Sequence, residues 1–244
     1  MASQAGQLDT QRVLDSERFG EYERFFDRTW MLERCLARID RPGLQLCDVG
    51  GATGVFLAQL AERSSHPFTG TLLEVDAGHR ARLVQEDLRF VHGSILENDL
   101  PGGAFDIVTF AHVLHHLVAD SAAETRELQA RALDEMLRIT KPGGYLIFEE
   151  QVNRVASFAR GVYELSRFAN RAGLRSKFFE AGTVVVRFMT PGEIESDLEV
   201  HVREHRARVE EHVLTPWNMP WRWKLTLLMS RVGCVAFVVQ RPLD

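Results

Sequence analysis

Short apolar runs alternate with segments of helical spacing from residue 44 to about residue 150. The apolar runs predict strands, and the segments between them repeat their apolar residues at helical intervals. Strands that alternate with helices favour right-handed crossovers and a mostly parallel sheet that is covered on both faces. The sequence therefore predicts an α/β fold, with strands at 44–49, 71–75, 89–92, 105–111 and 145–149 and helices near 54–63, 78–85 and 121–140.

The helix over 121–140 has the clearest boundaries. Ser121 and Glu124 have the spacing of a capping box, in which each side chain bonds the backbone N–H of the other residue. Apolar residues then recur on one face, and Pro142-Gly143-Gly144 ends the pattern.

The second half of the chain is less regular. Residues 155–174 predict a helix, 183–188 an apolar stretch, and Thr190-Pro191-Gly192-Glu193 another capped helix start. Residues 199–224 fit both a charged helix and a charged edge strand, and both interpretations stay open. Residues 225–229 and 234–239 are apolar closing elements, and the second is a final strand. Before the first strand, residues 16–37 predict a helix.

Composition excludes several classes of protein. The 244 residues are 45% hydrophobic and 26% charged, which suits one globular domain with an embellishment. The net charge of −5 argues against wholesale wrapping of nucleic acid. The three cysteines are widely spaced without a CxxC pair, so we expect reduced thiols and no metal site. Without an apolar run of signal-peptide or membrane-span length, we expect a cytoplasmic protein that does not contact a membrane.

Residues 46–54, LCDVGGATG, place a tight turn where the first predicted strand meets the first predicted helix. Its glycines let the backbone approach a ligand, and the helix that follows offers unpaired N–H groups. An ordinary strand-to-helix turn also favours glycine, but three glycines within five residues favour ligand binding. A dinucleotide fingerprint needs glycines at positions one, three and six, and the frames from Gly50 and Gly51 both fail. No Gly-Lys-Ser/Thr follows, which excludes a phosphate loop.

The turn resembles the first motif of the class I S-adenosylmethionine-dependent methyltransferases, an acidic residue followed by GxGxG. Here the motif runs from Asp48 through Gly50, Gly51 and Ala52 to Gly54, with Ala52 at the middle glycine. The resemblance implies a Rossmann-like, mostly parallel, seven-stranded sheet that binds S-adenosylmethionine. The resemblance covers about residues 44–150. We also expect an N-terminal helical segment over 1–43 that packs on the core as a lid, and a methyltransferase domain over 44–244 with a substrate-side insertion at about 152–224.

Further motifs follow in the order that this resemblance implies. The second strand ends LLEVD, where Glu74, with Asp76 as the alternative, would accept hydrogen bonds from the ribose hydroxyls. Gly93-Ser94-Ile95 resembles the adenine-binding loop. FDIVTFAHVLHHL and RITKPGGYLIFEE are similar to the ubiquinone/menaquinone-biosynthesis methyltransferases, and place Ala111 beside the methyl group.

Methyl transfer needs mainly an acceptor held in line with the methyl group in a dry site. His112 at the strand end is the first candidate for a catalytic side chain and His116 the second, since histidine titrates near neutral pH. The alternative is that these histidines hold the loop by bonding to backbone.

The acceptor is expected to be a small molecule, acidic or aromatic, and the protein a monomer or homodimer. Four residues, Arg160, Arg167, Arg171 and Arg175, share one arc of a predicted helix, either as a solvated face or as a docking surface for an acidic substrate or carrier. Aromatic residues outside the strand-helix core could cover the acceptor: Tyr22, Phe25, Phe26, Trp30, Trp217, Trp221 and Trp223.

Two rival functions stay open. A nucleic-acid methyltransferase is disfavoured by the acidic charge and by the absence of an Asn/Asp-Pro-Pro-aromatic tetrapeptide for an extruded base. A protein of the same fold could instead bind the cofactor while serving as a partner subunit or catalysing a rearrangement without methylation.

Overall fold

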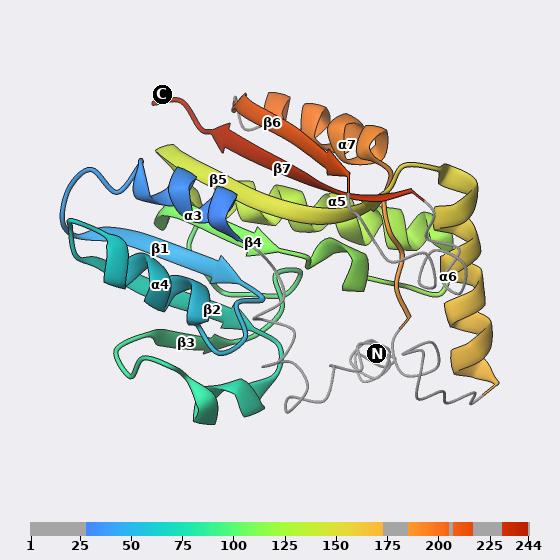
Figure 1. The fold of residues 1–244 in the computed structure, drawn as a ribbon, viewed down its shortest axis with the longest axis horizontal. Helices are drawn as coiled ribbons and strands as arrows, with labels where there is room; N and C mark the ends of the chain where they lie inside the picture. Colours follow the sequence, from blue (N-terminus) through green and yellow to red (C-terminus); the bar gives the residue numbers. More distant parts are fainter. Residues whose placement is uncertain (1–27, 173–184, 205–206, 217–230, 244) are drawn as a thin grey trace.

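The computed structural model describes residues 28–172, 185–204, 207–216 and 231–243. These form one sheet of seven strands in the order β3-β2-β1-β4-β5-β7-β6 (Figure 1). The pairs among β1 to β5 are parallel, whereas β7 runs antiparallel to both β5 and β6. The predicted mostly parallel α/β sheet is confirmed. Its strands are β1 Leu44–Val49, β2 Phe68–Glu74, β3 Arg89–His92, β4 Phe105–Ala111, β5 Thr140–Asn153, β6 Arg208–Pro216 and β7 Val232–Gln240.

Helices cover both faces of the sheet. The helices α3 (Thr29–Leu36) and α4 (Val55–Arg63) pack on one face, and α5 (Ala122–Ile139) and α7 (Pro191–Glu204) pack on the other (Figure 1). The helix α6 (Ala156–Arg171) stands beyond the carboxyl ends of β4 and β5, and the short 3-10 helices are η1 (Ala77–Arg82) and η2 (Leu114–His116). None of the helices in these ranges combines the length and apolar character that a bilayer span requires.

The two faces carry different side chains near the carboxyl ends of the strands. The α5 face is mainly apolar, with the rings of Phe110 and Phe148 stacked at 4.4 Å, but it carries the buried carboxylate of Glu150. The α3 face is apolar only in its first half and then becomes polar, although its side chains stay buried. This polar half, where a ligand would bind, carries Asp48, Thr109, Glu149 and Gln151.

Both predicted capping boxes are confirmed. Ser121 Oγ accepts from the Glu124 N–H at 3.1 Å, and Glu124 accepts from the Ser121 N–H at 3.1 Å. Thr190 and Glu193 make the same reciprocal pair, at 3.2 and 2.7 Å. Capping is readable from sequence because both partners lie within one turn.

One predicted element differs from the structure, and one open question is answered for the described residues. The helix expected at 78–85 is wrong, because the chain forms only the 3-10 helix η1. Asp76 accepts from the Gly78 N–H at 2.8 Å, and the Val84 N–H bonds Thr53 O at 3.1 Å, so no α-helical ladder continues there. Residues 199–224 contain both open alternatives, because α7 runs to Glu204 and β6 follows as an edge strand.

The other predicted elements either match the structure with shifted boundaries or lie outside the described residues. The final strand is β7. The strand expected at 145–149 is the longer β5, which pairs with β7 from Tyr145 to Asn153. The expected 155–174 helix is α6. Predictions for 16–27, 173–174, 183–184 and 217–229 lie outside the described residues, with Tyr22, Phe25, Phe26, Arg175, Trp217, Trp221 and Trp223.

Candidate active site

The glycine turn leaves β1 at its carboxyl end and enters α4. The Gly50 N–H bonds Leu73 O at 2.8 Å, which fixes the start of the turn against β2. Gly50, Ala52 and Gly54 have φ angles of +69°, +48° and +82°. This conformation is accessible to glycine and costs Ala52 about 1–2 kcal/mol. The residue at the middle glycine of the motif therefore has its backbone in the left-handed region.

Only glycine fits at position 51, because of the close neighbouring atoms and not because of its φ angle. A Cβ atom there would lie 2.3 Å from Asp48 Oδ2 and 2.5 Å from Leu72 Cδ2. Asp48 is 1% exposed and its Oδ1 accepts from the Thr109 hydroxyl at 2.8 Å, so the carboxylate cannot swing away without breaking that bond. The turn therefore has no room for a side chain at Gly51.

Glu74 connects the glycine turn to the end of β2. Its carboxylate accepts from the Ala52 N–H at 3.1 Å and from the Asp76 N–H at 3.0 Å, and the residue is 6% exposed. Asp76, the alternative from the sequence, instead caps η1 through Gly78 and lies 3.7 Å from His79 Nε2. Of the two acids, Glu74 is the one bonded to the turn.

The Gly93-Ser94-Ile95 loop follows β3 on the other side of β2. The Gly93 N–H bonds Glu74 O at 3.0 Å, and the Ser94 hydroxyl accepts from the Leu96 N–H at 3.2 Å. Ile95 is buried in the core at 3% exposure. The loop thus lies next to Glu74, as expected for residues that would contact one ligand together.

The chain after β4 bends sharply at His112, whose φ angle is +60°. The His112 N–H bonds Glu149 O at 2.9 Å, which keeps this residue against β5. Burial, reinforced by repulsion from His115 and Arg28, lowers the pKa of His112 to about 3. The imidazole is therefore neutral at pH 7, whereas the sequence had suggested a group that titrates there.

His115 and Glu150 form a buried pair beneath this bend. His115 Nδ1 lies 2.7 Å from Glu150 Oε1, and the Glu150 side chain is 0% exposed. The same carboxylate accepts from the Leu114 N–H at 2.7 Å and from the Gln151 N–H at 2.8 Å. The pair anchors η2, and with it the loop that carries His112 and His116, to β5.

The arginine arc of α6 lies at the carboxyl edge of the sheet, but its members differ. The Arg167 guanidinium lies 5.2 Å from the ring centre of Tyr163 and 3.8 Å from Glu164. Arg160 and Arg171 are exposed. Docking of an acidic substrate on this arc stays a prediction.

Comparison with known proteins agrees with this geometry. The family model described as "Methyltransferase domain" matches residues 47–148, from the middle of β1 into β5. Residues 47–148 of this chain are similar to that domain.

Two curated relatives bear the name demethylmenaquinone methyltransferase. The one from Clavibacter sepedonicus is 30% identical over 144 residues, which are 57% of this chain and 54% of the relative. The one from Beutenbergia cavernae is 33% identical over 129 residues, 51% of this chain and 48% of the relative. The chain thus spans about half the length of these relatives and resembles the class I S-adenosylmethionine-dependent methyltransferases of the ubiquinone/menaquinone group.

Among solved structures, the [4+2]-cyclase SpnF has a TM-score of 0.62 and 15% identity, covering 88% of this chain and 81% of its own. At this identity the likeness shows the fold alone. The likeness supports the fold described above, and it says nothing about the reaction.

The candidate site also contains polar residues that sequence reasoning missed. Glu149, Glu150 and Cys234 lie near the bend at His112, but none was assigned a role in the site from sequence. The signal that could have found the first two is FEE, where two carboxylates follow an apolar run within a strand that must be buried.

His116 supplies a test of the electrostatics of this loop. Burial, with repulsion from His115 and His112, lowers the pKa of His116 well below its usual range. An unfolded histidine takes up a proton below about pH 6.5, whereas folded His116 stays neutral. The unfolded state then binds more protons, so stability is fully present above about pH 6.5 and is lost as the pH falls below it.

We expect His116→Gln to reduce the slope of unfolding free energy against pH, by up to about 1.4 kcal/mol per pH unit below about pH 6.5. Urea unfolding at a series of pH values measures that slope. At about pH 8 histidine is neutral in both states, so any difference between the proteins there reports packing alone. Equal slopes for both proteins would contradict the lowered pKa.

Proposed function

We propose that this chain transfers a methyl group from S-adenosylmethionine to a small-molecule acceptor. The observation that carries the proposal is the buried Glu74 carboxylate, bonded to the glycine turn at Ala52 within the region that is similar to a methyltransferase domain. When bound, S-adenosylmethionine supplies a methyl group from its sulfonium centre.

The residues present fit such a cofactor. Side chains are excluded at Gly51, so backbone is all that a ligand meets there, and Glu74 offers carboxylate oxygens to a pair of hydroxyls. We assign the methionine and ribose portion to Asp48, Gly50, Gly51, Ala52 and Gly54, the ribose also to Glu74, the adenine to Gly93, Ser94 and Ile95, and the border of the methyl group to Ala111 and His112.

The part played by the chain in catalysis is orientation and the exclusion of water. His112 is held by its own backbone bond to Glu149 O, and its neutral imidazole can accept a hydrogen bond from the acceptor. Its low pKa makes it a weak general base, so an acceptor must either need no early deprotonation or lose its proton elsewhere. The same limit applies to His116, the second candidate.

A small, aromatic or acidic acceptor is supported by two observations. The curated relatives are named for demethylmenaquinone, and Arg160 and Arg171 are exposed on the helix beyond the carboxyl ends of β4 and β5. The net charge of −5 favours a small molecule over nucleic acid.

Binding is the first test, because turnover cannot be measured before the acceptor is known. We expect S-adenosylhomocysteine to release heat with the wild-type protein in calorimetry. Glu74→Gln is expected to bind it about 10- to 100-fold more weakly, since loss of hydrogen bonds to a buried charged group costs about 1–3 kcal/mol. Asp76→Asn is the matched control, and should keep the affinity because Asp76 bonds η1 instead.

Thermal melting of each variant separates lost binding from lost folding. Failure of the folded wild-type protein to bind would contradict the proposal, and an equal loss in Asp76→Asn would contradict the assignment of the ribose to Glu74 alone. A screen of cell extract for masses that rise by one methylene, with donor and enzyme present, then identifies the acceptor. Tight binding without any such product would favour a partner subunit or a reaction without methylation.

A further inference from the structure

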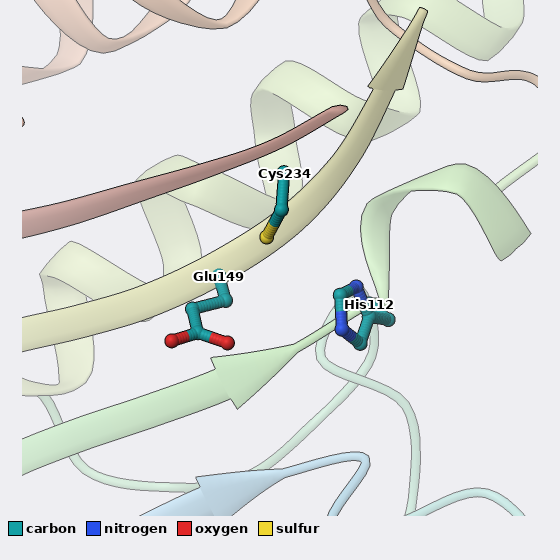
Figure 2. A group of neighbouring side chains, drawn as sticks. All are labelled: His112, Glu149 and Cys234. Atoms are coloured by element: carbon teal, nitrogen blue, oxygen red, sulfur yellow. The ribbon is translucent and has the colours of Figure 1, made fainter. Parts of the chain in front are cut away.

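Three side chains of metal-binding type meet next to the bend at His112. The ligand atoms of His112, Glu149 and Cys234 all lie within 4.8 Å of one another. They come from the end of β4, from β5 and from β7. Figure 2 shows the Cys234 thiol pointing to the side on which the Glu149 and His112 side chains lie. No sequence spacing could have predicted this group, because its members lie 37 and 85 residues apart.

Strand register brings them together. Ala111 pairs with Glu149 between β4 and β5, and Gln151 pairs with Cys234 between β5 and β7. Residues two apart on a strand share a face, so Glu149 and Cys234 project from the same side of the sheet. His112 follows directly after Ala111.

The backbone also fixes His112 in place. Its φ angle of +60° is rare for a residue with a Cβ atom, and such conformations persist where the surroundings determine them, often at binding sites. The bond from its N–H to Glu149 O, at 2.9 Å, ties it to the same residue whose carboxylate belongs to the group. The imidazole and the carboxylate are therefore positioned by one local contact.

Charge favours a cation in this position. Glu149 is 6% exposed and its neighbour Glu150 is fully enclosed, on the opposite face of β5. Glu150 has three hydrogen-bond donors of its own, from Leu114, Gln151 and His115. A cation bound here would be paired with the buried Glu149 carboxylate.

We propose that His112, Glu149 and Cys234 bind one zinc ion and leave its fourth position open. Zinc takes imidazole nitrogen, carboxylate oxygen and thiolate sulfur, and three protein ligands with an exchangeable fourth is its catalytic arrangement. Bonds of about 2.0–2.3 Å in tetrahedral geometry place ligand atoms about 3.5 Å apart. The ligand atoms of the present group lie within 4.8 Å of one another, so zinc binding would require the side chains to draw closer together.

The role of a bound zinc ion in the reaction rests on the proposed function, whereas the binding site itself does not. That proposal places the methyl group at Ala111 and His112, so the open position of the zinc would hold an oxygen or sulfur atom of the acceptor. Zinc would lower the pKa of such a group, so that the group would lose its proton to solvent water more readily on binding.

A second group among the described residues serves as an internal comparison. Asp134, His201 and Glu204 also lie within 4.8 Å of one another, between α5 and the end of α7. Glu204 is exposed and the group has no sulfur. A metal bound there would show no thiolate bond, which makes the two groups distinguishable by spectroscopy.

Cobalt(II) is the probe for the test, because it replaces zinc and its bond to thiolate gives a charge-transfer band in the near ultraviolet. We expect the full chain, freed of metal with a chelator, to bind one cobalt ion with this band and with strong visible bands of tetrahedral cobalt. Zinc should displace it. Cys234→Ser should remove the charge-transfer band, and His112→Asn, which tolerates a positive φ angle, should weaken binding at least tenfold.

Cys47→Ala is the matched control, because Cys47 is fully buried in the core of the opposite face and should keep the band. Absence of a thiolate band in the folded wild-type protein would overturn the proposal. So would a band that survives in Cys234→Ser but is lost in Cys35→Ser, or binding that only His201→Gln removes. Calorimetry with S-adenosylhomocysteine on the metal-free protein tests the proposed function separately, so either idea can fail alone.

Discussion

Gly51→Ala is expected to abolish measurable binding of S-adenosylhomocysteine and to destabilise the protein by about 1–3 kcal/mol, the cost of overpacking a filled site. The new Cβ atom would lie 2.3 Å from Asp48 Oδ2 and 2.5 Å from Leu72 Cδ2. Leu72 is fully buried and Asp48 is held by Thr109, so the turn itself must move. Movement of the turn displaces Ala52, whose N–H bonds Glu74.

Calorimetry and urea unfolding measure the two effects. Gly192→Ala is the matched control, because its Cβ atom would have nothing within 4 Å and alanine favours the helix α7. The control should bind as the wild-type protein does and be slightly more stable. Wild-type affinity in Gly51→Ala would show that the turn does not hold the ligand.

Much of the fold was predictable because its signals are local. The capping residues Ser121 and Thr190 each act within one turn of helix, and both helices begin where the sequence indicates. The parallel strands read as apolar runs because both of their faces are buried. The capping residues and the apolar runs can both be recognised within a short stretch of the sequence.

Elements that depend on distant contacts were not predictable in the same way. The expected helix at 78–85 is a 3-10 helix because the chain at Val84 bonds the glycine turn at Thr53. The charged segment 208–216 becomes an edge strand because β7 offers it a partner. Charge and alternation within the segment could not decide this.

In the candidate site, too, residues within local motifs were predictable and residues brought together by distant strands were not. The glycine turn and Glu74 belong to motifs in the order that the family resemblance implied, so they were found from sequence. The pair of His115 and Glu150, and the group of His112, Glu149 and Cys234, form only when β4, β5 and β7 are side by side. The low pKa of His112 likewise comes from burial and neighbouring charge, which a sequence does not show.

Glu150→Gln is expected to cost about 3 kcal/mol of folding free energy. The Glu150 carboxylate accepts from the Leu114 N–H on one oxygen, and from the Gln151 N–H and His115 Nδ1 on the other. An amide keeps one acceptor oxygen and turns an NH₂ group toward a buried donor. A buried donor without an acceptor costs about 1–3 kcal/mol, and the loss of charge adds to this. For a chain of this size the melting temperature should fall by about 6–12 °C.

The exposed Glu62→Gln on α4 is the comparison, since a surface substitution should change stability by less than about 0.5 kcal/mol. Because Glu150 anchors η2, the variant should also loosen the loop that carries His112, and hydrogen exchange of the amides in 112–117 should accelerate at a temperature where the protein is still folded. Unchanged exchange together with a lowered melting temperature would mean that Glu150 stabilises β5 alone. Unchanged stability would mean that the three hydrogen bonds contribute nothing, and the bend at His112 would then need another anchor.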